Sequence, residues 1–376
     1  LFSDHVSLAE ELKLKQFALQ HDLFVMGPDC GTAIINGVPL AFANVVNRGN
    51  IGIVAASGTG LQEVSSIISN LGEGISQAIG TGGRDVKKEI GGIMFLKGIE
   101  ALNNDPATEV IVLVSKPPDN EVLDRIVEKL SSVKKPVVAI FIGGDEKLLN
   151  QSRLIIAQTL EQAALIAVSA SRKKDLKIQD YPGKEIKNKL TEITQKELKT
   201  KNKHQKYVRG LFSGGTLCDE TQLIFDNKIG NIYSNTPLNY RFKLKDSSVS
   251  VKNTVIDLGD DEFTVGRPHP MIDFSLRNER ILQEISDPEV AVILLDLVIG
   301  YGSSLNSEKE FIPAIAAAKM EKPQITFICS ITGTDNDPQN RKELEQALLH
   351  AGALVCNSNA EASFLAVEII EKLGGN

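Results

Sequence analysis

The sequence predicts an α/β protein with two doubly wound parallel-sheet domains joined by a polar linker. Two stretches of the chain alternate short apolar runs with amphipathic helical patterns, which is typical of successive βα units. The predicted strands are apolar almost throughout, as expected where helices cover both faces of a sheet. With 376 residues, the chain has room for two or three domains of about 150 residues each.

The predicted elements follow one another along each stretch. In the first, apolar runs predict strands at Leu23–Gly27, Ile51–Ala56, Ile75–Gly80, Val110–Ser115 and Val137–Ile142. Helical periodicity predicts helices at Leu61–Asn70, Gly92–Asn103, Glu121–Ser132 and Thr159–Ser171. In the second, strands are predicted at Val208–Phe212, Val255–Leu258, Val292–Val298, Ile325–Ile328 and Ala353–Cys356. The corresponding helices are predicted at Thr216–Phe225, Leu276–Ile285, Glu308–Met320, Arg341–Ala351 and Ala360–Leu373.

These elements define four segments. Residues 1–20 have the pattern of a final helix, and no initiator Met or signal peptide precedes them, so we expect them to be the remnant of a missing upstream domain. Residues 21–171 and 207–376 form the two α/β domains. Residues 172–206 are rich in lysine and almost without apolar periodicity, which predicts a flexible linker. The alternative for this segment is a docking site for an acidic partner.

Composition excludes several classes of protein. Lys and Arg number 41 against 48 Asp and Glu, a net charge of −7, and Trp is absent. This balance argues against a partner nucleic acid, and no apolar run reaches the roughly 18 residues of a membrane span. The four cysteines are too scattered for a disulfide scaffold or a CxxC metal site. We therefore expect a soluble cytoplasmic protein with reduced thiols and no metal.

The two halves resemble each other. Each opens with a strand, a Ser-Gly turn and a helix, at Ala56–Gly60 and at Phe212–Thr216. Each later has an Asp-Pro pair before a buried strand, at Asp105–Pro106 and at Asp287–Pro288. Duplication of one doubly wound unit explains these parallels with the fewest assumptions, and chance similarity of two α/β units is the alternative.

Glycine-rich loops follow several of the predicted strands. In open parallel sheets, ligands bind at the carboxyl ends of the strands, and a helix N-terminus after a glycine turn offers backbone N–H groups to an anion. The sequence therefore predicts phosphate or carboxylate binding, although a glycine in a βα turn also occurs for conformational reasons alone. The candidate anion-binding residues are Ser57, Gly58, Thr59, Gly82, Gly83, Ser213, Gly214, Gly215, Thr216, Gly300, Gly302 and Ser303. None of these loops matches the GxxxxGK[ST] nucleotide-binding pattern.

The segment from Gly259 to Asp273 is the most distinctive. Prolines bracket His269, which predicts an extended backbone with Arg267 and His269 on the same side. Arg suits a carboxylate or phosphate, and His adds a donor or moves a proton. The alternative is a structural turn with a surface histidine. Of the nearby charged residues, Arg280 is predicted to form a structural salt bridge.

Several motifs resemble those of known families. Met26–Gly31, Ile51–Thr59 and Gly80–Asp85 resemble successive signatures of the succinyl-CoA synthetase α subunit, and Asp287–Gly302 is similar to the C-terminal domain of the β subunit. The resemblance implies flavodoxin-like domains of the succinyl-CoA synthetase type, the first of them α-subunit-like.

A closer resemblance is to the FdrA family of the NDP-forming acyl-CoA synthetase superfamily. Gly210–Leu217, Val265–Asp273 and Val298–Gly302 resemble its most specific motifs. The family fuses both units in one chain behind a CoA-binding-like domain, so the resemblance implies that this domain is what is missing before residues 1–20, and that CoA is bound through it.

The chain departs from the synthetase pattern at the phosphohistidine. The corresponding segment is Gly143–Lys147, and no His occurs between His21 and His204. The glutamate that steadies the histidine is replaced by Ser115–Pro118. Phosphoryl relay by that route therefore has no carrier.

The FdrA resemblance implies a subunit of an oxamate carbamoyltransferase in allantoin (purine) breakdown, working with neighbouring subunits of a hetero-oligomer. Phosphate would convert oxalurate to oxamate and carbamoyl phosphate, with the amides of Ser57–Thr59 and Gly300–Ser303 binding the small anions. Arg267 would clamp an anionic group, His269 would polarise the carbamoyl oxygen or pass a proton, and Arg84 or Lys116 would balance charge. The alternatives are an acyl-CoA ligase with an unrecognised carrier and a non-catalytic anion- or CoA-binding assembly subunit. A homodimer is compatible with each.

Overall fold

The computed structural model describes residues 1–3, 5–144, 154–174 and 181–374. Its contacts divide the chain into two compact units, Leu1–Ile178 with Gly300–Gly302, and Gln179–Ile299 with Ser303–Asn376. Residues 145–147 of the segment that replaces the histidine loop lie outside the described residues, as do residues 175–180 of the predicted linker.

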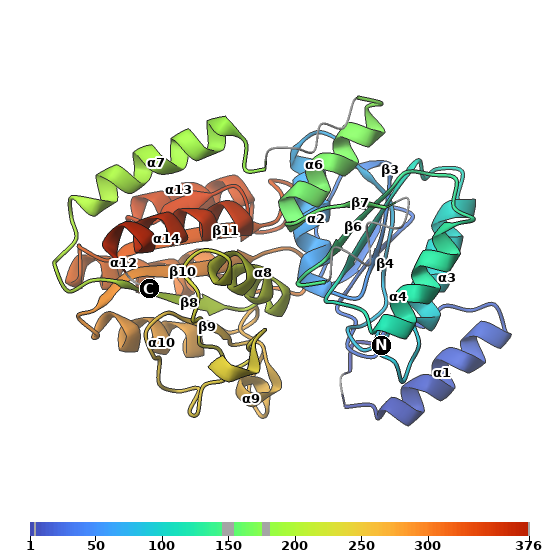
Figure 1. The fold of residues 1–376 in the computed structure, drawn as a ribbon, viewed down its shortest axis with the longest axis horizontal. Helices are drawn as coiled ribbons and strands as arrows, with labels where there is room; N and C mark the ends of the chain where they lie inside the picture. Colours follow the sequence, from blue (N-terminus) through green and yellow to red (C-terminus); the bar gives the residue numbers. More distant parts are fainter. Residues whose placement is uncertain (4, 145–153, 175–180, 375–376) are drawn as a thin grey trace. The chain divides into compact units, whose positions relative to one another are not determined.

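The first unit contains a seven-stranded sheet in the order β2-β1-β4-β3-β5-β6-β7. Its strands are β1 (Thr32–Ile35), β2 (Val38–Ala41), β3 (Arg48–Ala55), β4 (Ile75–Gly80), β5 (Val110–Ser115), β6 (Val137–Phe141) and β7 (Ile155–Ile156). Its helices are α1 (Leu8–Gln20), α2 (Gly58–Asn70), α3 (Ile93–Asn104), α4 (Asn120–Leu130) and α6 (Leu160–Ser171). Helices α2 and α6 pack together on one face of the sheet, and α3 and α4 on the other (Figure 1).

The second unit contains a five-stranded sheet in the order β12-β11-β10-β8-β9, parallel throughout. Its strands are β8 (Tyr207–Phe212), β9 (Thr254–Asp257), β10 (Val290–Val298), β11 (Thr326–Thr332) and β12 (Leu354–Cys356). Its helices are α7 (Lys184–Leu198), α8 (Gly215–Asp226), η1 (Tyr240–Phe242), α9 (Asp261–Thr264), α10 (Ser275–Ile285), α11 (Ser307–Glu310), α12 (Ile312–Glu321), α13 (Arg341–His350) and α14 (Asn359–Leu373). Helix α8 packs with α14, and α10 packs with α12.

Both parallel sheets have the same doubly wound order. Numbered within each unit, β3 to β7 and β8 to β12 both run 2-1-3-4-5, which is the flavodoxin-like order. The predicted fold class is confirmed, and the shared order supports the predicted duplication. The apolar runs form the central strands because nearly all of their side chains are buried, as is every residue of β10.

One predicted strand of the first unit was wrong, and a hairpin was missed. Residues 23–27, predicted as a strand, form an irregular connection after α1. The sheet edge is instead the antiparallel hairpin of β1 and β2, which turns at Asn36 and Gly37 with φ of 53° and 80°. An Asn-Gly pair between short apolar runs is the sequence signal for such a hairpin.

The predicted linker 172–206 contains a helix rather than a purely flexible connection. Helix α7 buries Leu190 and Thr194 and packs against α14, where Lys189 Nζ lies 2.6 Å from Glu361 Oε1. Leu190 and Thr194 are four residues apart and lie on one face of the helix. Two buried positions among many lysines are too few to give a clear apolar periodicity in the sequence. The second unit therefore begins before residue 207.

Replacing Leu190 by Ala is expected to loosen α7. The side chain is 3% exposed, and its truncation should cost about 2 kcal/mol or more, equivalent to roughly 30-fold faster amide exchange in residues 184–198. Hydrogen exchange with mass spectrometry measures this, with Lys187→Ala on the exposed side of α7 as the control. Equal, fast exchange in both variants and the wild type would show that the segment is a flexible linker after all.

Candidate functional site

The predicted loops gather at the topological switch point of each sheet. Strand order reverses between β3 and β5 in the first unit and between β8 and β10 in the second. Ligands of open α/β sheets bind at the carboxyl ends of the strands that flank such a point. The loops containing Ser57 and Ser213 follow β3 and β8 and therefore lie at these two places.

In the first unit, the N-terminus of α2 presents backbone N–H groups. Ser57 is the N-cap, and its hydroxyl accepts a hydrogen bond of 3.0 Å from the amide of Gly60. The amide of Leu61 donates to the Ser57 carbonyl. Gly58 is exposed and Thr59 half-buried, and as the first two helical residues their amides have no intrahelical acceptor. The geometry of this terminus suits an anion.

The loop after β4 lies beside this terminus. A Cβ placed on Gly83 would lie 3.7 Å from the Ala56 carbonyl oxygen, so the predicted residues 57–59 and 82–83 are close together. Gly82 has a φ of +84°, and a Cβ there would come within 2.2 Å of the Pro28 carbonyl oxygen. Only glycine fits this position, which holds the loop after β4 against the segment after α1.

The two predicted basic residues of the first unit have different surroundings. Lys116 is exposed and directly follows β5 at the switch point. Arg84 pairs with Glu11 of α1, with 3.0 Å between Nε and Oε2. Its predicted role in balancing substrate charge stays a prediction, and the structure gives it this partner within the unit.

A buried charge cluster beneath α1 was missed by sequence reasoning. Lys15 Nζ lies 2.8 Å from Glu11 Oε1 and 2.7 Å from Asp85 Oδ1, and all three side chains are fully buried. Lys15 also donates to the Thr81 carbonyl, and Asp85 accepts from the amide of Phe95 at the start of α3. Burial raises the pKa of Asp85, and Lys15 opposes that shift. The cluster ties α1 to the loop after β4.

In the second unit, a carboxylate of the chain itself occupies the predicted anion loop. Asp296 of β10 accepts hydrogen bonds from the amide of Ser213 at 2.8 Å, from the Ser213 hydroxyl at 3.0 Å and from the amide of Gly214 at 2.9 Å. The prediction that these two amides bind an external anion is therefore wrong for this structure. The signal that would have found Asp296 is a single charged residue in a nine-residue strand that is otherwise apolar.

A second carboxylate lies at the same helix start. A Cβ on Gly215, the first residue of α8, would come within 2.6 Å of Asp257 Oδ2, and Asp257 Oδ1 accepts from the amide of Gly259. Thr216, also predicted to bind an anion, is the buried second residue of the helix. Two carboxylates thus flank the beginning of α8.

Arg277 of α10 balances part of this charge. Its Nη2 donates to Asp296 Oδ1 at 3.0 Å, to the Asp296 carbonyl at 2.6 Å and to the Leu211 carbonyl at 3.0 Å. The guanidinium is fully buried and stacks on the ring of Phe311, 4.5 Å from its centroid. Nearby Cys329 is buried, which raises the pKa of its thiol to about 12 and leaves it without nucleophilic character near neutral pH.

The structure does not place Arg267 and His269 alike. Arg267 is exposed, whereas His269 is half-buried. The chain turns on both sides of His269 rather than running extended, because its carbonyl accepts from Ile272 and the amide of Arg267 donates to Thr264. Proline fixes φ but not ψ, which is why the predicted extended backbone was wrong.

His269 has a defined tautomer. Its Nδ1 accepts from the amide of Met271 at 3.2 Å, so the neutral ring carries its proton on Nε2. Burial lowers the pKa of His269, and Arg277 adds to that shift while Asp296 opposes it. Nε2 faces Gly259, where a Cβ would come within 2.7 Å of it. His269 is therefore a neutral hydrogen-bond donor near neutral pH.

The remaining predicted residues lie in the loop after β10. Gly300 and Gly302 have φ of 116° and 83°, conformations that favour glycine. Ser303 is buried, and its carbonyl accepts from Gln339 Nε2. The predicted structural salt bridge of Arg280 is confirmed, with Nε 2.6 Å from Glu284 Oε1.

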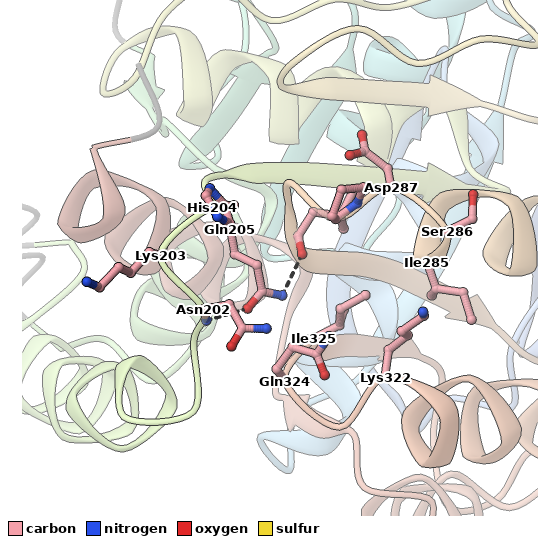
Figure 2. Close-up of a pocket in the computed structure, with 12 residues that line it drawn as sticks. Asn202, Lys203, His204, Gln205, Ile285, Ser286, Asp287, Lys322, Gln324 and Ile325 are labelled. Carbon is pink, nitrogen blue, oxygen red and sulfur yellow. Dashed lines mark hydrogen bonds between the residues drawn. The ribbon is translucent and has the colours of Figure 1, made fainter.

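A pocket of about 390 Å³ lies at the amino ends of the strands of the second sheet, away from the switch-point loops at their carboxyl ends (Figure 2). Its walls are the segments that precede β8, β10 and β11, and Gln205 donates across it to the Val290 carbonyl. It contains none of the predicted site residues. The residues that line it include Lys203, His204, Asp287 and Lys322.

No group of three or more His, Cys, Asp or Glu in the described ranges could hold a metal ion. None of the helices within those ranges has the length and apolar character needed to cross a membrane.

Comparison with known families agrees with the predicted likeness to succinyl-CoA synthetase-type ligases. The family described as CoA-ligase matches residues 211–369, and the family described as CoA binding domain matches residues 46–143. The second match lies within the first unit, so a CoA-binding-type domain is present in the chain itself.

Relatives and solved structures extend this comparison. The uncharacterized protein YahF of Escherichia coli (strain K12) is 45% identical over 376 residues, 99% of this chain and 72% of YahF. The ADP-forming sulfoacetate-CoA ligase subunit SqwL of Acholeplasma sp is 29% identical over 38% of this chain and 49% of that subunit, so the chain spans about half of its length. The apo dinucleotide-forming acetyl-coenzyme A synthetase 1 of Ca. Korarchaeum cryptofilum is 15% identical with a TM-score of 0.39, covering 99% of this chain and 77% of that one. On the extent of the match to YahF, the chain belongs to the family of that Escherichia coli protein, with a CoA binding domain and a CoA-ligase domain.

Proposed function

We propose that the chain is an acyl-CoA synthetase-type subunit that exchanges the phosphate of a small acyl phosphate for CoA. The observation that carries this proposal is the open N-terminus of α2, with Gly58 exposed, inside the segment that matches the CoA binding domain. The printed name of SqwL, an ADP-forming CoA ligase subunit, supports the same class of chemistry.

The reaction needs no protein nucleophile. The thiolate of CoA attacks the carbonyl carbon of the acyl phosphate, the bond between that carbon and the phosphate oxygen breaks, and phosphate leaves with the proton of the thiol. The amides of Gly58 and Thr59 and the dipole of α2 would stabilise the charge on the leaving phosphate. Lys116, exposed after β5, would supply a further positive charge.

The absence of a carrier histidine fits this half-reaction. No His occurs between His21 and His204, so the segment in the place of the phosphohistidine loop has no histidine to carry a phosphoryl group to a nucleotide. His269 in the second unit uses Nδ1 as an acceptor and Nε2 as a donor, which suits polarising a carbonyl better than carrying phosphate.

The test is thioester formation from CoA and acetyl or succinyl phosphate. We expect thioester and inorganic phosphate to appear in equal amounts without nucleotide. Parallel reactions with the free acid, ATP and CoA ask whether the chain also performs the nucleotide-dependent step. Folded protein that yields no thioester from either acyl phosphate would reject the proposal.

A second candidate is the oxamate carbamoyltransferase reaction implied by the FdrA resemblance. It also lacks a protein carrier, which is what the missing histidine favours, and its product, carbamoyl phosphate, is itself an acyl phosphate. Phosphate would attack the carbamoyl carbon of oxalurate and oxamate would leave, with Arg267 and His269 in the roles predicted for them. Phosphate-dependent release of oxamate by the chain with its neighbouring subunits, and no thioester formation, would favour this candidate.

A further inference from the structure

The two units place different residues at one equivalent position. Ala55 pairs with Val114 across the first switch point, and Leu211 pairs with Leu295 across the second. Two residues after Ala55 comes Ser57, and two residues after Leu211 comes Ser213. One residue beyond the paired Val114 and Leu295 are Ser115 and Asp296, which are therefore equivalent.

In the second unit, this position carries a charge aimed at the helix turn. The Asp296 carboxylate accepts three hydrogen bonds from Ser213 and Gly214, at 2.8–3.0 Å, and is fully buried. Charge-assisted bonds of this kind are what a bound carboxylate or phosphate makes at a helix start. Asp296 thus supplies internally the anion that this turn would otherwise take from solution.

In the first unit, the same position carries no charge. Ser115 is fully buried, and its hydroxyl has no hydrogen-bond partner among the described residues. By its register, its side chain points to the turn at Ser57 as that of Asp296 points to Ser213. Ser115 thus adds a buried, unpartnered hydroxyl on the strand that flanks the switch point, and a ligand oxygen held at the turn is the kind of partner that such a group takes.

We propose that the two helix starts are copies of one duplicated anion site, and that the Asp296 carboxylate occupies the copy at α8. We call the copy at α8 closed, because its amides already bind Asp296, and the copy at α2 open, because its amides are available to a phosphate. The chain then binds one phosphate, at α2, and the residue at position 115 or 296 determines whether each copy is open or closed. The claim that phosphate binds at α2 rests on the proposed function. The claim that Asp296 occupies the turn before α8 rests on the hydrogen bonds of its carboxylate.

Arg277 makes the closed copy testable by chemical rescue. It is fully buried, and in the described structure its Nε and Nη1 have no hydrogen-bond partner, so Asp296 is its one ionic contact. Replacing Asp296 by Gly removes the carboxylate and leaves a buried cation beside unpaired amides and a space the size of the lost side chain. A small carboxylate such as formate can enter that space and restore the contacts.

The experiment measures thermal stability in formate and in chloride at equal ionic strength. Asp296→Gly is expected to lower Tm on the order of 10 °C, and formate should recover much of this loss with saturation. Asp296→Asn is the matched control, because its amide fills the space while removing the charge, and formate should not stabilise it beyond the wild type. If the Gly variant folds only when formate is present, that is rescue. If formate neither stabilises nor recovers the Gly variant, the inference that Asp296 occupies an anion site is rejected.

Phosphate stoichiometry tests the open copy separately. Equilibrium dialysis with labelled inorganic phosphate should give one site per wild-type chain, and Ser115→Asp should weaken it roughly 100-fold or more by placing like charge beside the ligand. Two sites in the wild type would contradict the role of Asp296. No phosphate binding in the wild type, together with formate rescue of Asp296→Gly, would reject the proposed phosphate site at α2 and leave the inference about Asp296 intact.

Discussion

Gly58→Asp is expected to abolish thioester formation from acyl phosphates while leaving the free energy of unfolding unchanged or slightly higher. Gly58 is exposed and begins α2, and a Cβ there would meet only the Thr32 hydroxyl at 3.4 Å, an ordinary contact. A carboxylate in the first turn of a helix stabilises it by about 0.3–1 kcal/mol. The same charge would repel a phosphate held by the amides of Gly58 and Thr59.

The size of the expected loss follows from the distance between the charges. Two negative charges about 4 Å apart near a protein surface repel with about 4 kcal/mol, and a phosphate carries more than one charge, so an affinity loss of roughly 100-fold or more remains after screening. Thioester formation from acetyl phosphate and urea unfolding followed by circular dichroism measure the two effects. Gly58→Asn is the neutral control and should keep most of the activity. Equal losses in both variants would show that the glycine itself, rather than local charge, is what matters.

The sequence is a good guide wherever burial and apolar character coincide. Strands such as β5 and β10 could be predicted because nearly every side chain in them is apolar and buried. The hairpin at Asn36–Gly37 was missed, although it could have been predicted, because the Asn-Gly turn signal is local in sequence. A helix within residues 1–20 could be predicted, but the face that α1 buries could not. That face consists of Glu11, Lys15 and Ala18, and a periodicity analysis counts the first two as solvent-facing.

For the site too, the sequence predicts the position of the loops but not whether their amides are available to a ligand. Parallel topology alone puts the loops after β3 and β8 at the switch points, so their position could be predicted. Whether such a loop is open depends on Asp296, which is 83 residues from Ser213 in sequence and meets it only through strand register. The glycine pattern is the same in an open and a closed copy, and only the contacts distinguish them.

Replacing Lys15 by Met is expected to cost the first unit about 3–5 kcal/mol near pH 7. The variant keeps the length of the side chain but leaves Glu11 and Asp85 fully buried without the cation that both contact. Removing one partner of a buried ion pair has a cost of this size because the remaining charge is uncompensated. Asp85 also accepts from the amides of Met94 and Phe95, so the damage should reach the start of α3.

The loss should depend on pH with a definite sign. Burial already raises the pKa of Asp85, and without Lys15 only the hydrogen bonds from the amides of Phe95 and Met94 oppose that shift. The pKa of Asp85 should therefore rise further in the folded variant, which then binds a proton that the unfolded chain releases. A group with a raised folded pKa contributes most stability below its unfolded pKa, about 3.9 for Asp, and loses it as pH rises through the folded pKa. The deficit of the variant relative to wild type should therefore shrink from pH 7 toward pH 5.

Lys13→Met on the exposed side of α1 is the matched control and should change stability little at either pH. Urea unfolding by circular dichroism gives the overall effect, since the chain has no Trp, and amide exchange at Met94 and Phe95 reports the local one. A deficit that is independent of pH would mean that Lys15 acts through packing. A deficit shared with Lys13→Met would mean that the cluster does not hold α1 in place, because then the loss would follow the charge of the helix rather than its buried contacts.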